Sequence, residues 1–99
     1  MDLSEMKDNA TKASELLKVM ANQSRLMILC NLLDGEKSVQ ELQEPVGLSQ
    51  SALSQQLAVL RGQQLVTTRR VAQSVFYSIA SAEAETVIGT LYDLYCRKD

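Results

Sequence analysis

The stretch LSQSALSQQLAVLRGQQL, residues 48–65, decides the fold. Ser49 is a favourable N-cap residue, and the apolar residues after it recur at the spacing of one helix face until Gly62. The other side of this segment is polar and carries no acid. We therefore predict a helix over about 50–62. Its outer face consists of Gln50, Ser51, Ser54, Gln55 and Arg61.

A shorter helix precedes this one. Ser38, followed three residues later by Glu41, forms a capping box that marks a helix start. Pro45 stands late in that helix, and Gly47 closes it. Two short helices joined by a tight glycine-containing turn, the second with a polar outer face, are typical of a helix-turn-helix. We place this motif at about residues 38–62.

After the second helix the hydrophobic period changes from that of a helix to that of a strand. Val75, Tyr77 and Ile79 fall on one face of an extended chain. The pattern predicts two strands joined around residues 71–73. This hairpin occupies about residues 65–79 and would form a wing beside the helix-turn-helix. The polar residues near its tip are Arg69, Arg70 and Gln73.

Helices are also predicted at both ends of the chain, over about 3–20 and 82–97, with a very apolar helix over 25–33. The last helix carries more apolar surface than one small core needs, so we expect a second copy of the chain to cover it. The expected fold is a single, mainly α domain over residues 1–99. Its elements follow the order helix, helix, helix, helix, strand, strand, helix, and it forms a homodimer through its first and last helices.

The charge of the chain is unevenly distributed. The formal net charge is −2, yet residues 45–82 contain three arginines and no acid. A carboxylate there would repel phosphate, whereas Ser and Gln hydrogen-bond to base edges and to phosphates. We therefore expect this window to bind double-stranded DNA; a winged helix that binds a protein is the alternative. The expected DNA contacts are Ser49, Gln50, Ser51, Ser54, Gln55, Arg61, Arg69, Arg70 and Gln73.

Other classes of function find little support in the sequence. No apolar run approaches the roughly 20 residues of a membrane span, and the N-terminus lacks the apolar region of a secretory signal. We therefore expect a cytoplasmic protein that does not associate with membranes. An enzyme is not expected, because the chain has no histidine to act as a base and no glycine-rich phosphate loop.

The segments LLKVMANQSRLMILCNLL, SVQELQEPVGLSQSALSQQLAVLRGQQLV and RRVAQSVFYSI resemble the ArsR/SmtB family of dimeric winged-helix repressors. The resemblance covers nearly the whole chain, and ANxxR and LSQSALSQxL are its most specific marks. It implies that residues 50, 51, 54 and 55 face DNA and that Arg69 and Arg70 lie on the wing. It also implies a dimer through the first and last helices, which would read an inverted-repeat operator.

Many members of this family sense metals, but the residues here do not favour a metal site. Ser38 and Gln40 stand where the family's thiolate ligands would be needed, and the chain has no histidine. Soft and borderline metals prefer thiolate and imidazole ligands. We therefore expect no metal and no other cofactor.

The two cysteines are Cys30, in an apolar helix, and Cys96, near the end of the chain. Taken alone, Cys30 is typical of a small buried apolar residue. The ILC and LYC segments, however, resemble a subgroup of the family in which two cysteines act as a dithiol switch for reactive sulfur or oxidants. That resemblance implies that the two thiols lie close together and become bridged; structural cysteines are the alternative. Such regulators either repress or activate by displacing a DNA-silencing protein, and the sequence leaves this choice open.

Overall fold

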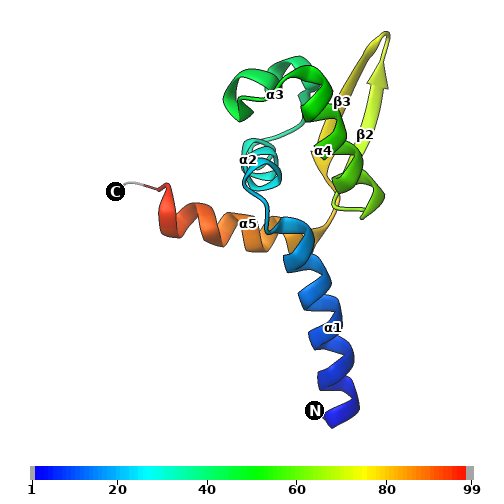
Figure 1. The fold of residues 1–99 in the computed structure, drawn as a ribbon, viewed down its shortest axis with the longest axis vertical. Helices are drawn as coiled ribbons and strands as arrows, with labels where there is room; N and C mark the ends of the chain where they lie inside the picture. Colours follow the sequence, from blue (N-terminus) through cyan, green and yellow to red (C-terminus); the bar gives the residue numbers. More distant parts are fainter. Residues whose placement is uncertain (1, 98–99) are drawn as a thin grey trace.

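A computed structural model describes residues 2–97 of the chain, and its elements form a helical body with a protruding hairpin (Figure 1). The described residues adopt the predicted mainly α, winged helix-turn-helix arrangement. The elements are α1 (Leu3–Met20), α2 (Gln23–Asn31), β1 (Lys37–Ser38), α3 (Val39–Val46), α4 (Gln50–Gly62), β2 (Val66–Val71), β3 (Ser74–Ile79) and α5 (Ala82–Tyr95).

The sequence pattern does not predict β1, because a two-residue strand has no readable period. Lys37 and Ser38 pair antiparallel with Tyr77 and Phe76, which gives a three-stranded sheet in the order β1-β3-β2. Ser38 is also the N-cap of α3, and its hydroxyl accepts a 3.2 Å hydrogen bond from the Glu41 amide. The Glu41 carboxylate in turn accepts a 2.9 Å bond from the Ser38 amide. The predicted capping box is confirmed, and it joins the wing to the helix-turn-helix.

The two helices of the helix-turn-helix end differently. Gly47 closes α3 in the left-handed conformation, with φ of 77°. In contrast, α4 runs through Gly62, and the left-handed residue after it is Gln64, with φ of 65°. The amide of Leu65 then donates back to the Leu60 carbonyl at 2.9 Å, which closes the helix end. A position that favours glycine is therefore occupied by glutamine.

Two predicted boundaries differ from the structure. Val71 still belongs to β2 and pairs with Ser74, so the hairpin turn consists of Ala72 and Gln73 alone. The last helix was predicted to reach residue 97, but α5 ends at Tyr95 with Cys96 as its C-cap. Arg97 therefore lies beyond the helix.

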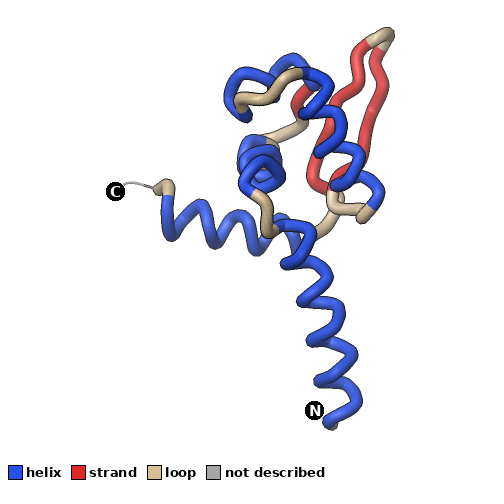
Figure 2. Tube along the Cα trace, viewed as in Figure 1, coloured by secondary structure: helices blue, strands red, loops and turns tan. Residues whose placement is uncertain are grey.

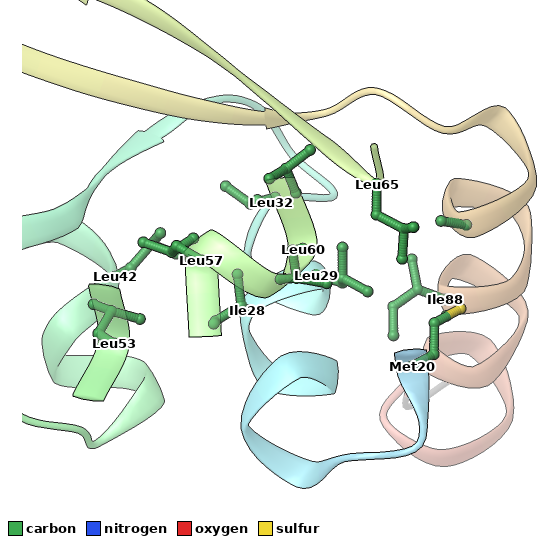
Figure 3. Packing of buried hydrophobic residues seen from close by; sticks show 12 residues of the cluster. Met20, Ile28, Leu29, Leu32, Leu42, Leu53, Leu57, Leu60, Leu65 and Ile88 are labelled. Carbon is green, nitrogen blue, oxygen red and sulfur yellow. The ribbon is translucent and has the colours of Figure 1, made fainter. Parts of the chain in front are cut away.

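The hydrophobic core lies where α2, α3, α4 and α5 meet the start of β2 (Figure 3). Leu29 and Leu60 occupy its middle, and Ile88 of α5 and Leu65 close one side. From α1 only Met20 is buried, with Leu16 and Val19 packed partly against the core, so the earlier turns of that helix project from the body (Figure 2). The core therefore fixes α4 against α2 and leaves α1 with few partners in its own chain.

Large apolar side chains stay exposed on the two terminal helices. Leu3 of α1 is 70% exposed, and Leu94 and Tyr95 of α5 are 70% and 82% exposed. The projecting helices also extend the molecule to 49 Å and raise its radius of gyration to 14.7 Å, above the roughly 13 Å typical of a compact domain of this length. Within residues 2–97, no helix combines the length and apolar character that a membrane crossing requires.

Candidate nucleic-acid interface

The outer face of α4 presents a row of side chains that have no partner in the described part of the chain. Gln50, Ser51, Ser54 and Gln55 are all exposed, and none makes a side-chain hydrogen bond to residues 2–97. The inner face of the helix packs into the core through Leu53, Leu57 and Leu60. The core therefore fixes α4 through its inner face and leaves its polar outer face accessible to a DNA duplex.

Two further predicted contacts flank this row. The Ser49 hydroxyl accepts a 3.2 Å hydrogen bond from the Ala52 amide, so Ser49 caps α4 and still has its hydroxyl proton and one lone pair for a further partner. Arg61 is exposed and lies about three helical turns beyond Gln50, on the same face. Both residues therefore border the α4 face, with the cap at one end and the cation at the other.

The two wing arginines differ in their surroundings. The guanidinium of Arg69 donates to both carboxylate oxygens of Glu36, with Nε 3.1 Å from Oε2, and lies 5.6 Å from the centre of the Phe76 ring. This ion pair lowers the pKa of Glu36 and raises that of Arg69. Arg70 and Gln73 are exposed and make no such contact within residues 2–97. Only one of the two arginines is therefore free of a carboxylate.

Glu36 is a residue that sequence reasoning missed. It precedes the acid-free window of residues 45–82, and the short strand β1 brings it beside the wing. Because β1 pairs with β3 and β3 with β2, Arg69 reaches across the central strand to Glu36. The hydrophobic pattern carries no signal for this contact, since it depends on a strand of two residues.

Arg25 and Gln56 form a second pair that the sequence reading missed. Arg25 Nη1 donates to Gln56 Oε1 at 3.0 Å, and Arg25 Nε donates to the Val19 carbonyl at 2.5 Å. The Arg25 amide also donates to the side chain of Asn22, the N-cap of α2, at 3.0 Å. The ANxxR segment and the lone polar residue on the inner face of α4 were the available signals. Together these bonds connect α1, α2 and α4.

The structure brings the two cysteines together. Cys30 is half-buried on α2, Cys96 is exposed at the end of α5, and both line one pocket of about 300 Å³. Burial raises the pKa of the Cys30 thiol, and so does the nearby Cys96. Cys30 packs against the core, but it is not enclosed by it. Both cysteines are free thiols in this structure.

The family's metal sites have no counterpart among the described residues. Within residues 2–97, no group of three or more His, Cys, Asp or Glu side chains is placed to hold a metal ion. Cys30 and Cys96 alone supply two sulfur ligands, fewer than the three or four protein ligands of common zinc sites.

A helix-turn-helix with a free polar recognition face, flanked by a basic wing, defines a winged-helix DNA-binding transcriptional regulator. Comparison with known proteins supports this class and narrows it. A family profile described as "Bacterial regulatory protein, arsR family" matches residues 22–68. The chain belongs to this family, as its resemblance to ArsR/SmtB proteins predicted.

Relatives extend the match over nearly the full chain. The transcriptional activator HlyU of Vibrio cholerae is 56% identical over 97 residues, which cover 98% of this chain and 90% of the relative. The biofilm growth-associated repressor of Xylella fastidiosa is 38% identical over 99 residues, covering 100% and 87%.

Solved structures agree with the sequence comparison. Reduced HlyU from Vibrio cholerae superposes with a TM-score of 0.91 at 56% identity, covering 96% of this chain and 100% of that chain. The repressor BigR from Xylella fastidiosa superposes with a TM-score of 0.87 at 39% identity, covering 99% and 100%. The chain is therefore a DNA-binding transcriptional regulator of the HlyU and BigR type.

Proposed function

We propose that this regulator is a homodimer that binds an inverted-repeat operator and whose DNA affinity is controlled by the Cys30/Cys96 dithiol. The inducers would be reactive sulfur species or oxidants, encountered in the cytoplasm. The observation that carries the proposal is that Cys30, on α2, and Cys96, the C-cap of α5, line one pocket and that Cys96 is near enough to raise the pKa of Cys30. A disulfide needs Cα atoms within about 7 Å, so the proposal requires the two residues of this pocket to meet that limit.

The dimer is proposed because α1 and α5 both expose apolar side chains that their own chain does not cover. A second copy that packed against these helices would bury Leu3 and Leu94. In such a dimer the two α4 helices would enter successive major grooves, about 34 Å apart, and would read two inverted half-sites. The exposed residues of α4 would read base edges, and Arg61, Arg70 and Gln73 would contact the backbone.

The proposed control follows from how the helices pack. Helix α5 contacts α2, and α2 contacts both α3 and α4. A bridge between Cys30 and Cys96 would tie the end of α5 to α2 and shift the dimer helix relative to the recognition helix. Because the two recognition helices must match the groove spacing, a small shift would break several phosphate contacts at once. DNA affinity would then fall by orders of magnitude.

Fluorescence anisotropy on promoter DNA from the protein's own locus tests this proposal. We expect polysulfide or peroxide to weaken binding by the wild type at least tenfold and to leave Cys30→Ser and Cys96→Ser unchanged. Reductant should restore the wild type. Tight binding that ignores every treatment would mean that the cysteines are structural and that control lies elsewhere.

Whether the regulator activates or represses transcription is a separate question. One relative is named an activator and another a repressor, and the same DNA contacts would serve either role. We propose that an activating member competes with a DNA-silencing protein for the same site. In vitro transcription with and without the silencing protein distinguishes activation by competition from direct repression. Activation that appears only when the silencing protein is present supports competition. Repression of transcription from naked DNA contradicts competition.

A further inference from the structure

Cys30 lines two hollows, of which one contains charged side chains and the other does not. One has a volume of about 530 Å³ and is lined by charged side chains, Asp34, Lys37 and Asp93, together with apolar ones such as Leu33. The other is the pocket of about 300 Å³ that Cys30 shares with Cys96. Cys96 lines only this second pocket, so a reagent in the polar hollow reaches one thiol, whereas a reagent in the shared pocket reaches both.

The wall of the shared pocket consists almost entirely of carbon and sulfur. No lining residue is charged, and Gln23 is the only one with an amide side chain. Arg97, the residue after Cys96, lies 4.0 Å from Asp93 and does not line the pocket. An anion that entered would lose water without gaining a cation, which is unfavourable. The apolar lining residues are Leu26, Met27, Ile88, Leu91, Tyr92 and Tyr95.

The two thiols also differ in accessibility. Cys30 is half-buried and its pKa is raised, first by burial, so less of it is the reactive thiolate. Cys96 is exposed and borders the apolar pocket. A small polar oxidant in the polar hollow meets only Cys30, and it reaches the exposed Cys96 from solvent without a site that holds it there. An oxidant with an apolar group can instead be held beside Cys96.

We propose that the shared pocket makes apolar organic peroxides, of the organic hydroperoxide class, preferred over hydrogen peroxide as oxidants of this regulator. The inference rests on the proposed dithiol control and names the chemistry of its inducer. A volume of about 300 Å³ is at the lower end of small-molecule sites, which suits a short alkyl or a single aryl group. Each CH₂ group that the pocket removes from water would raise the binding constant of the oxidant about fourfold.

The chemistry balances with the two thiols alone. The Cys96 thiolate attacks the terminal hydroperoxide oxygen, a sulfur–oxygen bond forms, the O–O bond breaks and the organic part leaves as an alcohol after taking a proton. The Cys30 sulfur then attacks the Cys96 sulfenic acid, and the S–S bond forms as water leaves. The dithiol loses two electrons, and the hydroperoxide is reduced to alcohol and water.

The test compares two oxidants on the full-length reduced protein without DNA. Mass spectrometry follows the Cys30–Cys96 disulfide as cumene hydroperoxide or hydrogen peroxide is added, and N-acetylcysteine provides the reference for an unshielded thiol. We expect the rate ratio of cumene hydroperoxide to hydrogen peroxide to be at least tenfold higher for the protein than for the reference. Equal ratios would overturn the inference.

A variant pair connects the preference to the pocket. Met27 lines the pocket and is 37% exposed, so Met27→Lys should fold while placing a cation at the rim. We expect this change to bring the rate ratio close to the reference, and Val71→Lys, on the exposed wing, to leave it unchanged. An unaltered ratio in Met27→Lys would overturn the pocket's role. A disulfide that forms without preference refutes only this inference, whereas no disulfide with either oxidant refutes the dithiol control as well.

Discussion

Arg25 donates a 3.0 Å hydrogen bond to Gln56 on the inner face of α4, while its Nε holds the Val19 carbonyl in the last turn of α1. One guanidinium thus joins the end of a terminal helix to the back of the recognition helix. Its charge also lies at the negative end of the α1 dipole, where a cation is stabilising. The contact fixes α4 relative to α1 on the side away from the expected DNA face.

The first prediction concerns this contact. Gln56→Met removes the acceptor with little change in shape. Because a hydrogen bond to a charged group contributes about 1.5–3 kcal/mol, we expect roughly tenfold weaker binding to a specific duplex. Binding to a scrambled duplex should change much less, since it depends on charge. Anisotropy on a duplex selected from a random library measures both affinities.

Gln63→Met is the matched control, because Gln63 follows α4 and makes no side-chain hydrogen bond within residues 2–97. It should leave both affinities unchanged. Equal specific affinity for Gln56→Met and the wild type would show that the Arg25 contact does not position the recognition helix.

The second prediction separates the two wing arginines. Arg70 has no carboxylate partner in the described chain, whereas Arg69 is paired with Glu36. Each phosphate contact contributes about 0.9 to the slope of log affinity against log salt. We expect Arg70→Gln to lower the slope by about this amount per subunit, and Arg69→Gln to lower it clearly less. Equal losses would mean that Arg69 leaves Glu36 for phosphate when DNA binds.

The third prediction concerns the pH dependence of the wing. The hydrogen bond from Arg69 holds the pKa of Glu36 below its ordinary value of 4.5. A carboxyl with a lowered folded-state pKa stabilises the protein above its unfolded-state value, and this contribution is lost as the pH falls through the folded-state pKa. The Tm of Glu36→Gln should therefore lie slightly below that of the wild type at pH 7. The two values should converge below pH 4.5, and a constant gap throughout would contradict the pairing.

The fourth prediction concerns the end of α4. Gln64 adopts a left-handed conformation, φ 65°, that costs a residue with a side chain about 1–2 kcal/mol. Gln64→Gly should relieve this strain and raise the free energy of unfolding by about 0.5–1 kcal/mol after the entropy of glycine is counted. Gln63→Gly, at an ordinary φ of −93°, should lower it by a similar amount. Urea denaturation measures both, and a loss of stability in Gln64→Gly would contradict the assigned strain.

Local sequence signals were sufficient for the elements that build the helix-turn-helix. The caps at Ser38 and Ser49 each accept the backbone hydrogen bond that their position predicts. The change of period after residue 62 correctly predicted the hairpin. These features depend on neighbours within about four residues, which the sequence displays directly.

The contacts that sequence reasoning missed join residues far apart in the chain. Arg25 and Gln56 are 31 positions apart, and Glu36 and Arg69 are 33 apart. A polar residue on an apolar face and an acid outside the basic window were visible, but their partners depend on how the helices and strands pack. The proximity of Cys30 and Cys96 was likewise implied only by resemblance to a family, since no local pattern connects them.

The projecting α1 has a consequence for how long a newly made chain survives. This helix has 18 residues and only Met20 is buried, whereas most helical stability in proteins comes from tertiary packing. Outside the proposed dimer, this end of the chain would be open to fraying and to cleavage by proteases. Assembly would protect that end, so the half-life of the regulator would rise with its own concentration.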